Sequence, residues 1–370
     1  MAETCDVLVS GTGNFGSRII FDIAVTARRP VKVAIGGRNL ERMNWLRLAA
    51  NARANIFGTP AEFQVVPIRY DTPESVAESI GKLAPKVVVQ AASVQSSAVI
   101  SQSDTAWSRL VAQAGLSTTA IFQVLLSARV GKAMQMLGNK GPLLNCCYPD
   151  VANGMLKAIG LPVTCGAGNV AILATMFGGD LGIREPGRVK VLAHYACLDA
   201  WRRAPAERAG KTEPRVWIDG KETGNLFDRF SHLKLTREPV IDISGCTGVP
   251  VILALASGER LVAHAPGPNG LIGGYPIVVE SAAVRLDLPA GVSESEAIAW
   301  NRGFEERNGM LVDDKGWVRF TGNVQTEFAR HSPELAKGLD ITDIERAAKE
   351  MGAFRDRLDG GLNGPPSARF

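Results

Sequence analysis

The chain has 370 residues and a net charge of +4 at pH 7, with 46% hydrophobic and 21% charged residues. This composition is typical of a globular protein, and the length favours two domains over a single core. The small net charge and the lack of a basic run interleaved with aromatic residues argue against a nucleic-acid partner. We also expect no membrane partner, because no apolar run is long enough to span a bilayer.

The pattern with the most information lies near the start of the chain. A short apolar run, Val7 to Val9, predicts a buried strand that leads directly into Gly-x-Gly-x-x-Gly and then into an apolar helical pattern. This context is the one a dinucleotide fingerprint requires, because its glycines allow a tight turn, approach of a pyrophosphate and close helix–strand packing. The expected cofactor-binding residues here are Gly11, Thr12, Gly13, Asn14, Phe15 and Gly16.

The end of the second strand indicates which dinucleotide binds. NAD-binding chains usually place Asp or Glu there to accept the ribose hydroxyls. In this chain the strand from Val31 to Ile35 is followed by Gly-Gly-Arg-Asn, which offers a guanidinium for a 2′-phosphate and no carboxylate to repel it. We therefore expect NADP, with a glycine-rich turn and solvated arginines as the alternative. The residues expected to contact it are Gly37, Arg38, Asn39 and Arg42.

Strands continue to alternate with helices as far as residue 178, which predicts an α/β fold with a doubly wound parallel Rossmann sheet. The fourth strand ends in small residues, so we expect Ala91, Ala92 and Ser93 to lie against the nicotinamide ribose. The next strand places Asn145 at the edge where ligands bind, within reach of the nicotinamide or the substrate. Asp150 follows it and is interpreted as the cap of the next helix.

From residue 179 the pattern changes. Alternating runs at 189–194, 215–218 and 259–264 predict an antiparallel sheet, and helical patterns return at 293–307 and 340–358. A strand and glycine turn at 163–170 is expected to close the first half. The chain is thus predicted to contain an NADP-binding Rossmann domain at 1–178 and an α+β substrate and dimerisation domain at 179–370.

The order of these motifs resembles that of lactate and malate dehydrogenases. The glycine turn, Arg109, the strand ending at Asn145 and the segment 160–169 match, in order, that family's fingerprint, mobile-loop arginine, Asn-Pro strand and Gly-rich segment. The layout is also similar to that of the family 4 glycosidases, and the Gly-Gly-Arg-Asn turn resembles that of saccharopine-dehydrogenase-like reductases. The resemblance implies a two-domain oxidoreductase that forms a homodimer.

Two departures from the family pattern concern the catalytic residues. The family's Leu-Asp-x-x-Arg is replaced after Asn169 by Val-Ala-Ile-Leu-Ala-Thr, so the carboxylate that orients its histidine and an arginine that binds its substrate are missing. The family's His-Gly-Asp is replaced by a segment containing His194 and Tyr195. Ordinary lactate or malate chemistry is therefore not expected.

His194 is the first candidate for the acid/base, because hydride transfer to a carbonyl leaves an alkoxide that needs a proton. The alternative is a satisfied histidine buried in the sheet. Tyr195 is expected to orient or assist it, or to be structural. Arg109 follows a Ser-rich segment and is a candidate carboxylate clamp, with a solvated helix arginine as the alternative. Arg202 and Arg203 are a second cationic pair.

The function predicted from these residues is an NADP-dependent oxidoreductase that moves hydride between NADPH and a C=O or C=N carbon of a small polar substrate. A 2-oxo acid fits if Arg109 is a clamp. The alternatives are an opine- or saccharopine-like imine reductase, a non-catalytic NADP-binding sensor, and NAD-assisted glycoside cleavage. No metal is expected, because Gly168 rather than Cys165 falls at the glycosidase cysteine position. The scattered cysteines favour reduced thiols and a cytoplasmic location.

Overall fold

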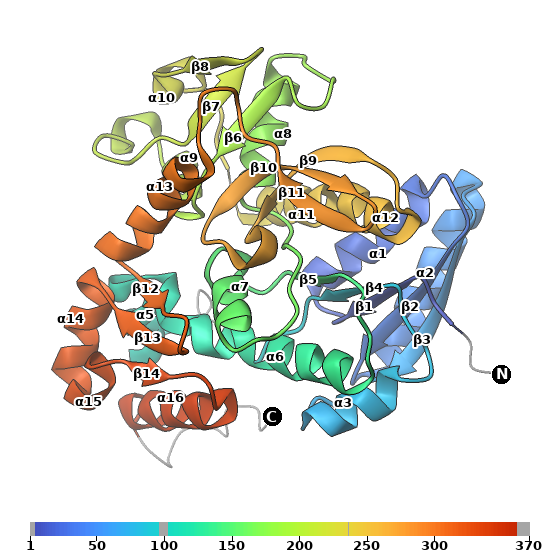
Figure 1. The fold of residues 1–370 in the computed structure, drawn as a ribbon, viewed down its shortest axis with the longest axis horizontal. Helices are drawn as coiled ribbons and strands as arrows, with labels where there is room; N and C mark the ends of the chain where they lie inside the picture. Colours follow the sequence, from blue (N-terminus) through green and yellow to red (C-terminus); the bar gives the residue numbers. More distant parts are fainter. Residues whose placement is uncertain (1–3, 96–102, 236, 361–370) are drawn as a thin grey trace.

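The computed structural model describes residues 4–95, 103–235 and 237–360. Its centre is a parallel sheet of five strands in the order β3-β2-β1-β4-β5 (Figure 1). Helices connect successive strands and lie on both faces, so the predicted doubly wound α/β sheet is confirmed. The elements of this part are β1 (Val7–Ser10), α1 (Asn14–Thr26), β2 (Val31–Gly37), α2 (Leu40–Phe57), β3 (Ala61–Pro67), α3 (Pro73–Ile80), β4 (Val87–Gln90), α5 (Ala106–Ala114), η1 (Leu116–Thr119), α6 (Ala120–Met136), β5 (Leu143–Asn145), α7 (Pro149–Ala158) and α8 (Val170–Asp180).

The rest of the chain forms small antiparallel sheets with helices between them, as expected for an α+β part. The sheets have the orders β6-β7-β8, β11-β10-β9 and β12-β13-β14. The elements are β6 (Val189–Leu192), α9 (Ala196–Trp201), η2 (Pro205–Glu207), β7 (Arg215–Ile218), β8 (Lys221–Thr223), α10 (Leu226–Arg229), α11 (Arg237–Thr247), α12 (Val249–Ser257), β9 (Leu261–Pro266), η3 (Pro268–Gly270), β10 (Gly274–Glu280), β11 (Ala283–Leu286), α13 (Glu294–Arg307), β12 (Met310–Val312), β13 (Trp317–Phe320), α14 (Gly322–His331), α15 (Pro333–Ala336), β14 (Leu339–Asp340) and α16 (Ile344–Leu358).

Two details differ from the sequence-based expectations. The strand expected at 163–170 is only a single bridge between Cys165 and Leu144, because the chain turns at Gly166, which packs against Pro149. The three alternating runs also do not share one sheet: the first two form β6 and β7, whereas the third forms β9. One bridge, between Ala193 and Gly274, joins these two sheets.

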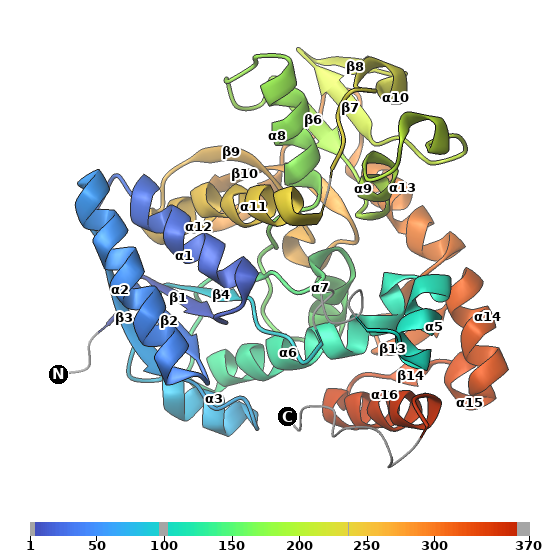
Figure 2. The same cartoon turned by 180° about the vertical axis from the view of Figure 1, so that it is seen from behind.

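Helices from the later part of the chain return to the parallel sheet. Figure 2 shows α11 and α12 next to α1, and both contact α1, while α12 also reaches β4. The predicted boundary at residue 178 lies inside α8, which packs against β6 and β9. A division of the chain at that point stays a prediction.

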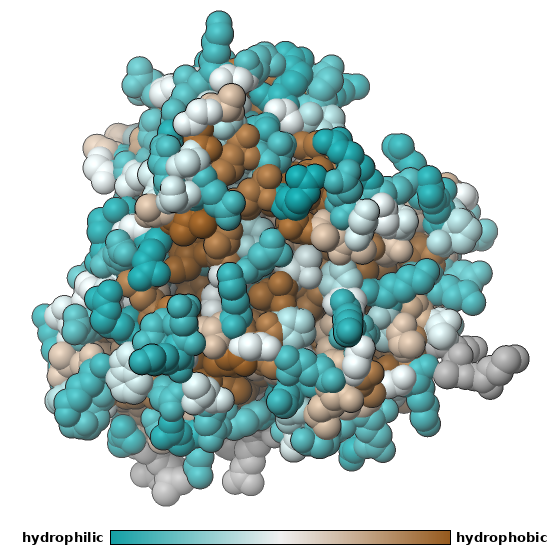
Figure 3. Space-filling model, viewed as in Figure 1, coloured by the Kyte–Doolittle hydropathy of each residue, from teal (hydrophilic) through white to brown (hydrophobic). Residues whose placement is uncertain are grey.

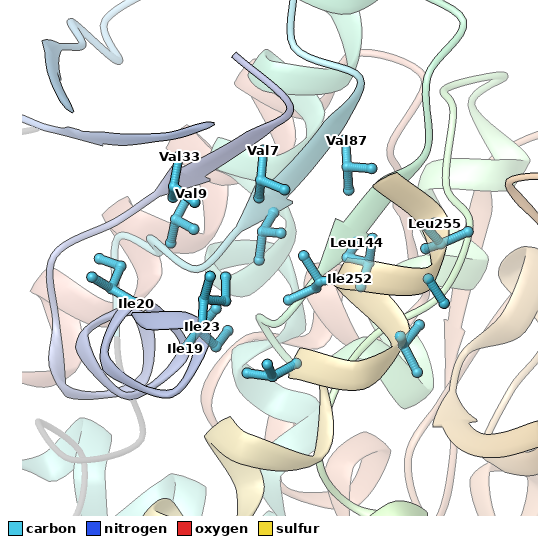
Figure 4. Close-up of a cluster of buried hydrophobic side chains, with 14 of the residues drawn as sticks. Val7, Val9, Ile19, Ile20, Ile23, Val33, Val87, Leu144, Ile252 and Leu255 are labelled. Atoms are coloured by element: carbon cyan, nitrogen blue, oxygen red, sulfur yellow. The ribbon is translucent and has the colours of Figure 1, made fainter. Parts of the chain in front are cut away.

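The alternation of side chains along the strands explains the two apolar layers. Val7 and Val33 face the layer of α1 and α12, where Ile23 and Ile252 pack against them (Figure 4). Leu8 and its neighbours on adjacent strands face the opposite layer, which α3 and α6 cover. Because successive residues of a strand point to opposite faces, a strand such as β1, which is apolar from Val7 to Val9, is buried on both sides.

Apolar side chains also gather in the middle of the face drawn in Figure 3. They lie where Figure 1 draws α7 and the ends of α13 and β10. In the part of the chain that the structure describes, no helix is both long and apolar enough to cross a membrane.

His264 in β9 joins its sheet to strand β6 of the neighbouring sheet, and its burial makes the stability of the fold depend on pH. Its Nε2 accepts a hydrogen bond from the backbone N–H of Val191 at 3.0 Å, and burial lowers its pKa from 6.5 to about 4. The folded pKa lies below the unfolded one, so the stabilisation is complete above pH 6.5 and is lost as the pH falls from 6.5 towards 4. We expect wild type to lose about 2 kcal/mol more unfolding free energy between pH 7 and pH 5 than His264→Gln, which keeps an acceptor.

Urea unfolding at the two pH values checks this expectation, with the exposed His331→Gln as the matched control. Equal losses in wild type and His264→Gln would contradict it.

Candidate functional site

The glycine turn between β1 and α1 leaves one position open. Gly11 has φ +128°, and a Cβ there would lie 2.7 Å from the backbone nitrogen of Ala92; a Cβ at Gly16 would lie 2.2 Å from the carbonyl oxygen of Gly11. Both positions therefore require glycine for close packing. Gly13 differs, because a Cβ there would meet no atom within 4 Å. The open space lies at the N-terminus of α1, where a pyrophosphate would approach.

The charge around this turn suits an anion. The first turn of α1 contains no acidic residue, and no side chain caps its N-terminus. Arg42 lies beside it: Nη2 donates to Ser17 Oγ at 3.1 Å, and Nε lies 3.5 Å from the carbonyl oxygen of Thr12. Free N–H groups, the positive end of the helix dipole and a guanidinium thus converge on the turn.

Arg38 stands exposed at the end of β2, directly before α2. Among the described residues it has no hydrogen-bond or ion-pair partner, so its guanidinium can meet an anion from outside. Asn39 instead caps α2, because its Oδ1 accepts from the backbone N–H of Arg42 at 2.9 Å. Gly37 lets Thr12 lie close, since a Cβ there would be 3.0 Å from Thr12 Cγ2.

The residues after β4 lie at the same edge of the sheet. The N–H of Ala91 donates to the carbonyl oxygen of Ser10 at 2.7 Å, and Ala92 accepts from the thiol of Cys147 at 3.2 Å. Ser93 is partly exposed and donates to the carbonyl oxygen of Gln95 at 3.1 Å. These small residues therefore lie next to the glycine turn, as the order of the strands requires.

Asn145 ends β5 at this edge, but its amide is already fully paired. Oδ1 accepts from Ser127 Oγ and from the backbone N–H of Cys147, both at 2.9 Å. Nδ2 donates to Asn153 Oδ1 at 2.9 Å and to the carbonyl oxygen of Cys147 at 3.2 Å. The side chain is completely buried and holds the turn that follows β5. A role for Asn145 in binding the nicotinamide stays a prediction.

The candidate arginines lie at the surface. Arg109 in α5 is 58% exposed and pairs with Asp104 at 2.5 Å, and Arg203 pairs with Asp199 at 3.0 Å. Neither ion pair includes His194, Tyr195, Ser117 or Glu305. Closure of Arg109 over a substrate stays a prediction.

Asp150 is not a helix cap, which corrects the sequence-based interpretation. The residue before α7 is Tyr148, in the left-handed region at φ 52°, and Asp150 lies in the first turn of the helix. Its carboxylate instead joins two distant segments. Oδ1 accepts from the backbone N–H of Tyr195 at 3.0 Å, and Oδ2 accepts from the amide of Asn169. Asn169 has φ 47°, so the carboxylate secures a turn that an L-residue rarely adopts.

Burial dominates the electrostatics of Asp150. It raises the pKa of the completely buried carboxyl above its ordinary value, while the nearby His194 and the hydrogen bonds from Asn169 and Tyr195 oppose the rise. A buried carboxylate is tolerated only where such partners compensate for lost hydration.

His194 faces a second buried carboxylate, that of Glu305 in α13. His194 Nε2 lies 3.1 Å from Glu305 Oε1, and neither atom has a hydrogen-bond partner in the described structure. The imidazole stacks on Phe304, with ring centroids 4.9 Å apart, and its Nδ1 accepts from the N–H of Ala196 at 3.3 Å. His194 is thus buried beside a carboxylate rather than exposed in a cleft.

Ser117 connects this pair to two tyrosines. Its hydroxyl donates to Glu305 Oε2 at 3.0 Å and lies 2.8 Å from the hydroxyl of Tyr148 and 3.3 Å from that of Tyr195. Polar groups therefore follow one another from Tyr195, which is partly exposed, through Ser117 and Glu305 to His194. The last step is an ion-pair distance of 3.1 Å and not a hydrogen bond. We call these four residues the Tyr195 relay.

Burial and a neighbouring carboxylate decide the protonation of the Tyr195 hydroxyl. Burial, and then the charge of Glu305, raise the pKa of the Tyr195 hydroxyl above its ordinary value. The hydroxyl therefore stays protonated at neutral pH and can donate.

Sequence reasoning found His194 and Tyr195 but missed Ser117 and Glu305. A signal for Glu305 exists, because it follows Ala297 and Asn301 at steps of four on the buried side of α13. A carboxylate at such a position is unusual unless it is paired. Ser117 carries no comparable signal, since only the fold brings η1 against α13.

No protein-family model matches the chain, and no curated protein matches it by sequence. Solved structures do resemble it. The putative glucosidase LplD from Bacillus subtilis aligns over 94% of this chain and 100% of its own, at 13% identity and a TM-score of 0.52. A lactate dehydrogenase from Cryptosporidium parvum, with lactic acid and nicotinamide adenine dinucleotide, aligns over 99% and 100%, at 14% identity and a TM-score of 0.46.

A malate dehydrogenase from Cryptosporidium parvum also resembles the chain, covering 82% of it and 96% of its own length at 14% identity, with a TM-score of 0.42. The putative glucosidase, with its TM-score of 0.52, confirms the expected layout at the level of the fold. The likeness of the Gly-Gly-Arg-Asn turn to saccharopine-dehydrogenase-like reductases stays a prediction. Within the described ranges, no group of three or more His, Cys, Asp or Glu side chains is arranged to hold a metal ion, and Cys165 is buried in the core.

Proposed function

We propose that this chain is an NADP-dependent oxidoreductase that reduces a C=O or C=N carbon of a small polar substrate. The observation that carries the proposal is the open position at Gly13, at the N-terminus of α1, with Arg42 beside it and the unpaired Arg38 at the end of β2. These residues fit a dinucleotide that carries a 2′-phosphate. When bound, NADPH supplies the hydride.

The residues proposed to hold the cofactor lie in one line along the sheet edge. The backbone from Gly11 to Gly16 and the start of α1 would bind the pyrophosphate. Arg38 would bind the 2′-phosphate, because a guanidinium matches phosphate geometry in two parallel hydrogen bonds. Ala91 to Ser93, being small, leave room for the ribose beyond the pyrophosphate.

The Tyr195 relay is the proposed source of the proton. Reduction of a carbonyl or imine needs one proton at the oxygen or nitrogen, and Tyr195 is the end of the relay that is partly exposed. Loss of its proton would leave a phenolate, which the Ser117 hydroxyl would stabilise by turning its hydrogen bond from Glu305 to Tyr195 until water returns the proton. His194 would position the carboxylate of Glu305 and would not meet the substrate, which differs from its expected role as the acid/base.

The substrate class depends on Arg109. A 2-oxo acid is favoured if Arg109 closes over the site as a carboxylate clamp, whereas an imine substrate of the opine or saccharopine type needs no such clamp.

A protein that binds NADP without turnover is the alternative from another class, motivated by the missing Asp and Arg after Asn169. Binding without turnover across a broad panel of carbonyls and imines would favour it.

The likeness to LplD motivates a further alternative, NAD-assisted glycoside cleavage. That reaction regenerates its cofactor, so NADPH would not be consumed, and activity would depend on a metal. Loss of glycosidase activity with a chelator would favour it over reduction.

Arg38→Ala tests the cofactor assignment. We expect it to weaken NADP binding about 10- to 100-fold and to leave NAD binding within about twofold, because only NADP carries the 2′-phosphate that Arg38 would bind. Isothermal titration calorimetry with both nucleotides measures the effect. Arg285→Ala, an exposed arginine on β11, is the matched control. Tighter binding of NAD than of NADP by wild type would contradict the assignment.

Tyr195→Phe tests the proton source. Removal of the hydroxyl is expected to lower kcat about 10²- to 10⁴-fold, the range for loss of a general acid, without changing the Kd for NADPH. Ser117→Ala is expected to lower kcat less and to shift its pH profile, because it removes the hydroxyl that would stabilise the phenolate and not the proton donor. Steady-state NADPH consumption and fluorescence titration measure the two quantities. An unchanged kcat in Tyr195→Phe would rule out the assigned role.

A further inference from the structure

Arg208 is a buried positive charge without a counter-charge. It lies in the segment between α9 and β7, at the periphery of the molecule (Figure 1). Only 1% of the residue is exposed, although its chain neighbours Glu207 and Ala209 are exposed, so the guanidinium lies directly beneath the surface. Within the ranges that the structure describes, its single hydrogen bond runs from Nη2 to the carbonyl oxygen of Leu233, at 2.6 Å. Such burial is costly unless an opposite charge accompanies it.

Two acidic residues of the same segment are engaged elsewhere. Asp199 Oδ2 lies 3.0 Å from Nε of Arg203 and 3.4 Å from Nζ of Lys211. Glu213 Oε1 accepts a hydrogen bond from a backbone N–H of α10 at 2.8 Å. These carboxylates therefore leave the charge of Arg208 uncompensated.

Three buried N–H donors lie together here, and none has an acceptor among the described residues. They are Nε and Nη1 of Arg208 and Nε1 of Trp201, a residue that is completely buried. The guanidinium carbon lies 4.8 Å from the centroid of the Trp201 ring, so the three donors belong to one small region. A guanidinium and an indole N–H can only donate. The group that completes this region must therefore be an acceptor with several lone pairs.

The surroundings hold these donors in place before any ligand arrives. The ring of Trp201 packs edge-on against Phe177 and Phe227, with ring centroids 5.3 and 5.4 Å away. The guanidinium in turn lies over the Trp201 ring, and the hydrogen bond to Leu233 fixes one of its corners. A rigid guanidinium suits carboxylate and phosphate groups, because each presents several oxygens to its N–H groups.

We propose that Arg208 and Trp201 form a binding site for a small oxyanion, a carboxylate or a phosphate group, beneath the segment 202–214. The bound group supplies acceptors for the three donors and a counter-charge for the guanidinium. Its entry displaces the covering segment, whose only regular element is the three-residue turn η2. Trp201 ends α9 and Tyr195 precedes it, so this site and the Tyr195 hydroxyl belong to opposite ends of a helix about 9 Å long. The proposal does not depend on the proposed NADP chemistry.

The indole N–H resonances of the full chain, labelled with ¹⁵N-tryptophan, test the proposal. The six tryptophans give six signals, and the signal that Trp201→Phe removes belongs to Trp201. Sodium phosphate and sodium acetate, each titrated at constant ionic strength, are expected to shift this signal saturably, with half-saturation below about 10 mM. The signals of the exposed Trp45 and Trp317 are the internal controls. The anion with the lower half-saturation concentration distinguishes a phosphate ligand from a carboxylate ligand.

Variants of Arg208 locate the effect. Arg208→Met is expected to abolish the saturable shift, and Arg208→Lys to raise the half-saturation concentration at least fivefold, because it keeps the charge but loses the spread of donors. Arg203→Met removes an exposed positive charge from the same segment and is the matched control, expected to stay within about twofold of wild type. The remaining indole signals show whether each variant is folded.

Three results would overturn the proposal: no saturable shift of the Trp201 signal in wild type up to about 50 mM of either anion, an equal shift with sodium chloride, or a folded Arg208→Met that responds like wild type. In each case Arg208 serves only to fasten the segment to Trp201 and Leu233. If Arg208→Met does not fold, Arg208→Lys decides, and a half-saturation concentration equal to that of wild type counts against the site.

Discussion

The buried carboxylate of Asp150 holds the candidate site together. It accepts hydrogen bonds from Asn169, in the turn before α8, and from the backbone of Tyr195, at the start of α9. Because a buried charge costs several kcal/mol unless its hydrogen bonds are made, these segments have one favourable arrangement. That arrangement brings the carboxyl edge of the parallel sheet against Tyr195 and directs its hydroxyl to Ser117. The turn before α8 and the Tyr195 relay therefore depend on one side chain.

The fold could be predicted from the sequence wherever local patterns decide it. The apolar run Val7 to Val9, the glycine turn and the alternation of strands with helices each have a period or a residue type that sets the structure. The 163–170 segment could not be predicted, because its β-like sequence yields to the packing of Gly166 on Pro149. The separation of β9 from β6 and β7 likewise depends on contacts distant in sequence.

The site was predictable only in part, for the same reason. His194 and Tyr195 stand out as reactive residue types at the end of an alternating run. Their partners Ser117 and Glu305 lie far away in the chain, in a 3₁₀ turn and an amphipathic helix, and only the fold brings them together. Asp150 has the pattern of a helix cap, yet its carboxylate binds Asn169 and Tyr195, and Tyr195 lies beyond the predicted domain boundary. Residues that act through tertiary contacts leave little trace in local sequence.

A crystal structure of the protein with NADP is the most direct test of this account. The pyrophosphate should lie over Gly13 at the N-terminus of α1, the 2′-phosphate beside Arg38, and the nicotinamide ring within reach of a substrate that also touches the Tyr195 hydroxyl. A dinucleotide bound elsewhere, or a nicotinamide ring turned away from Tyr195 with Arg38 in solvent, would contradict it.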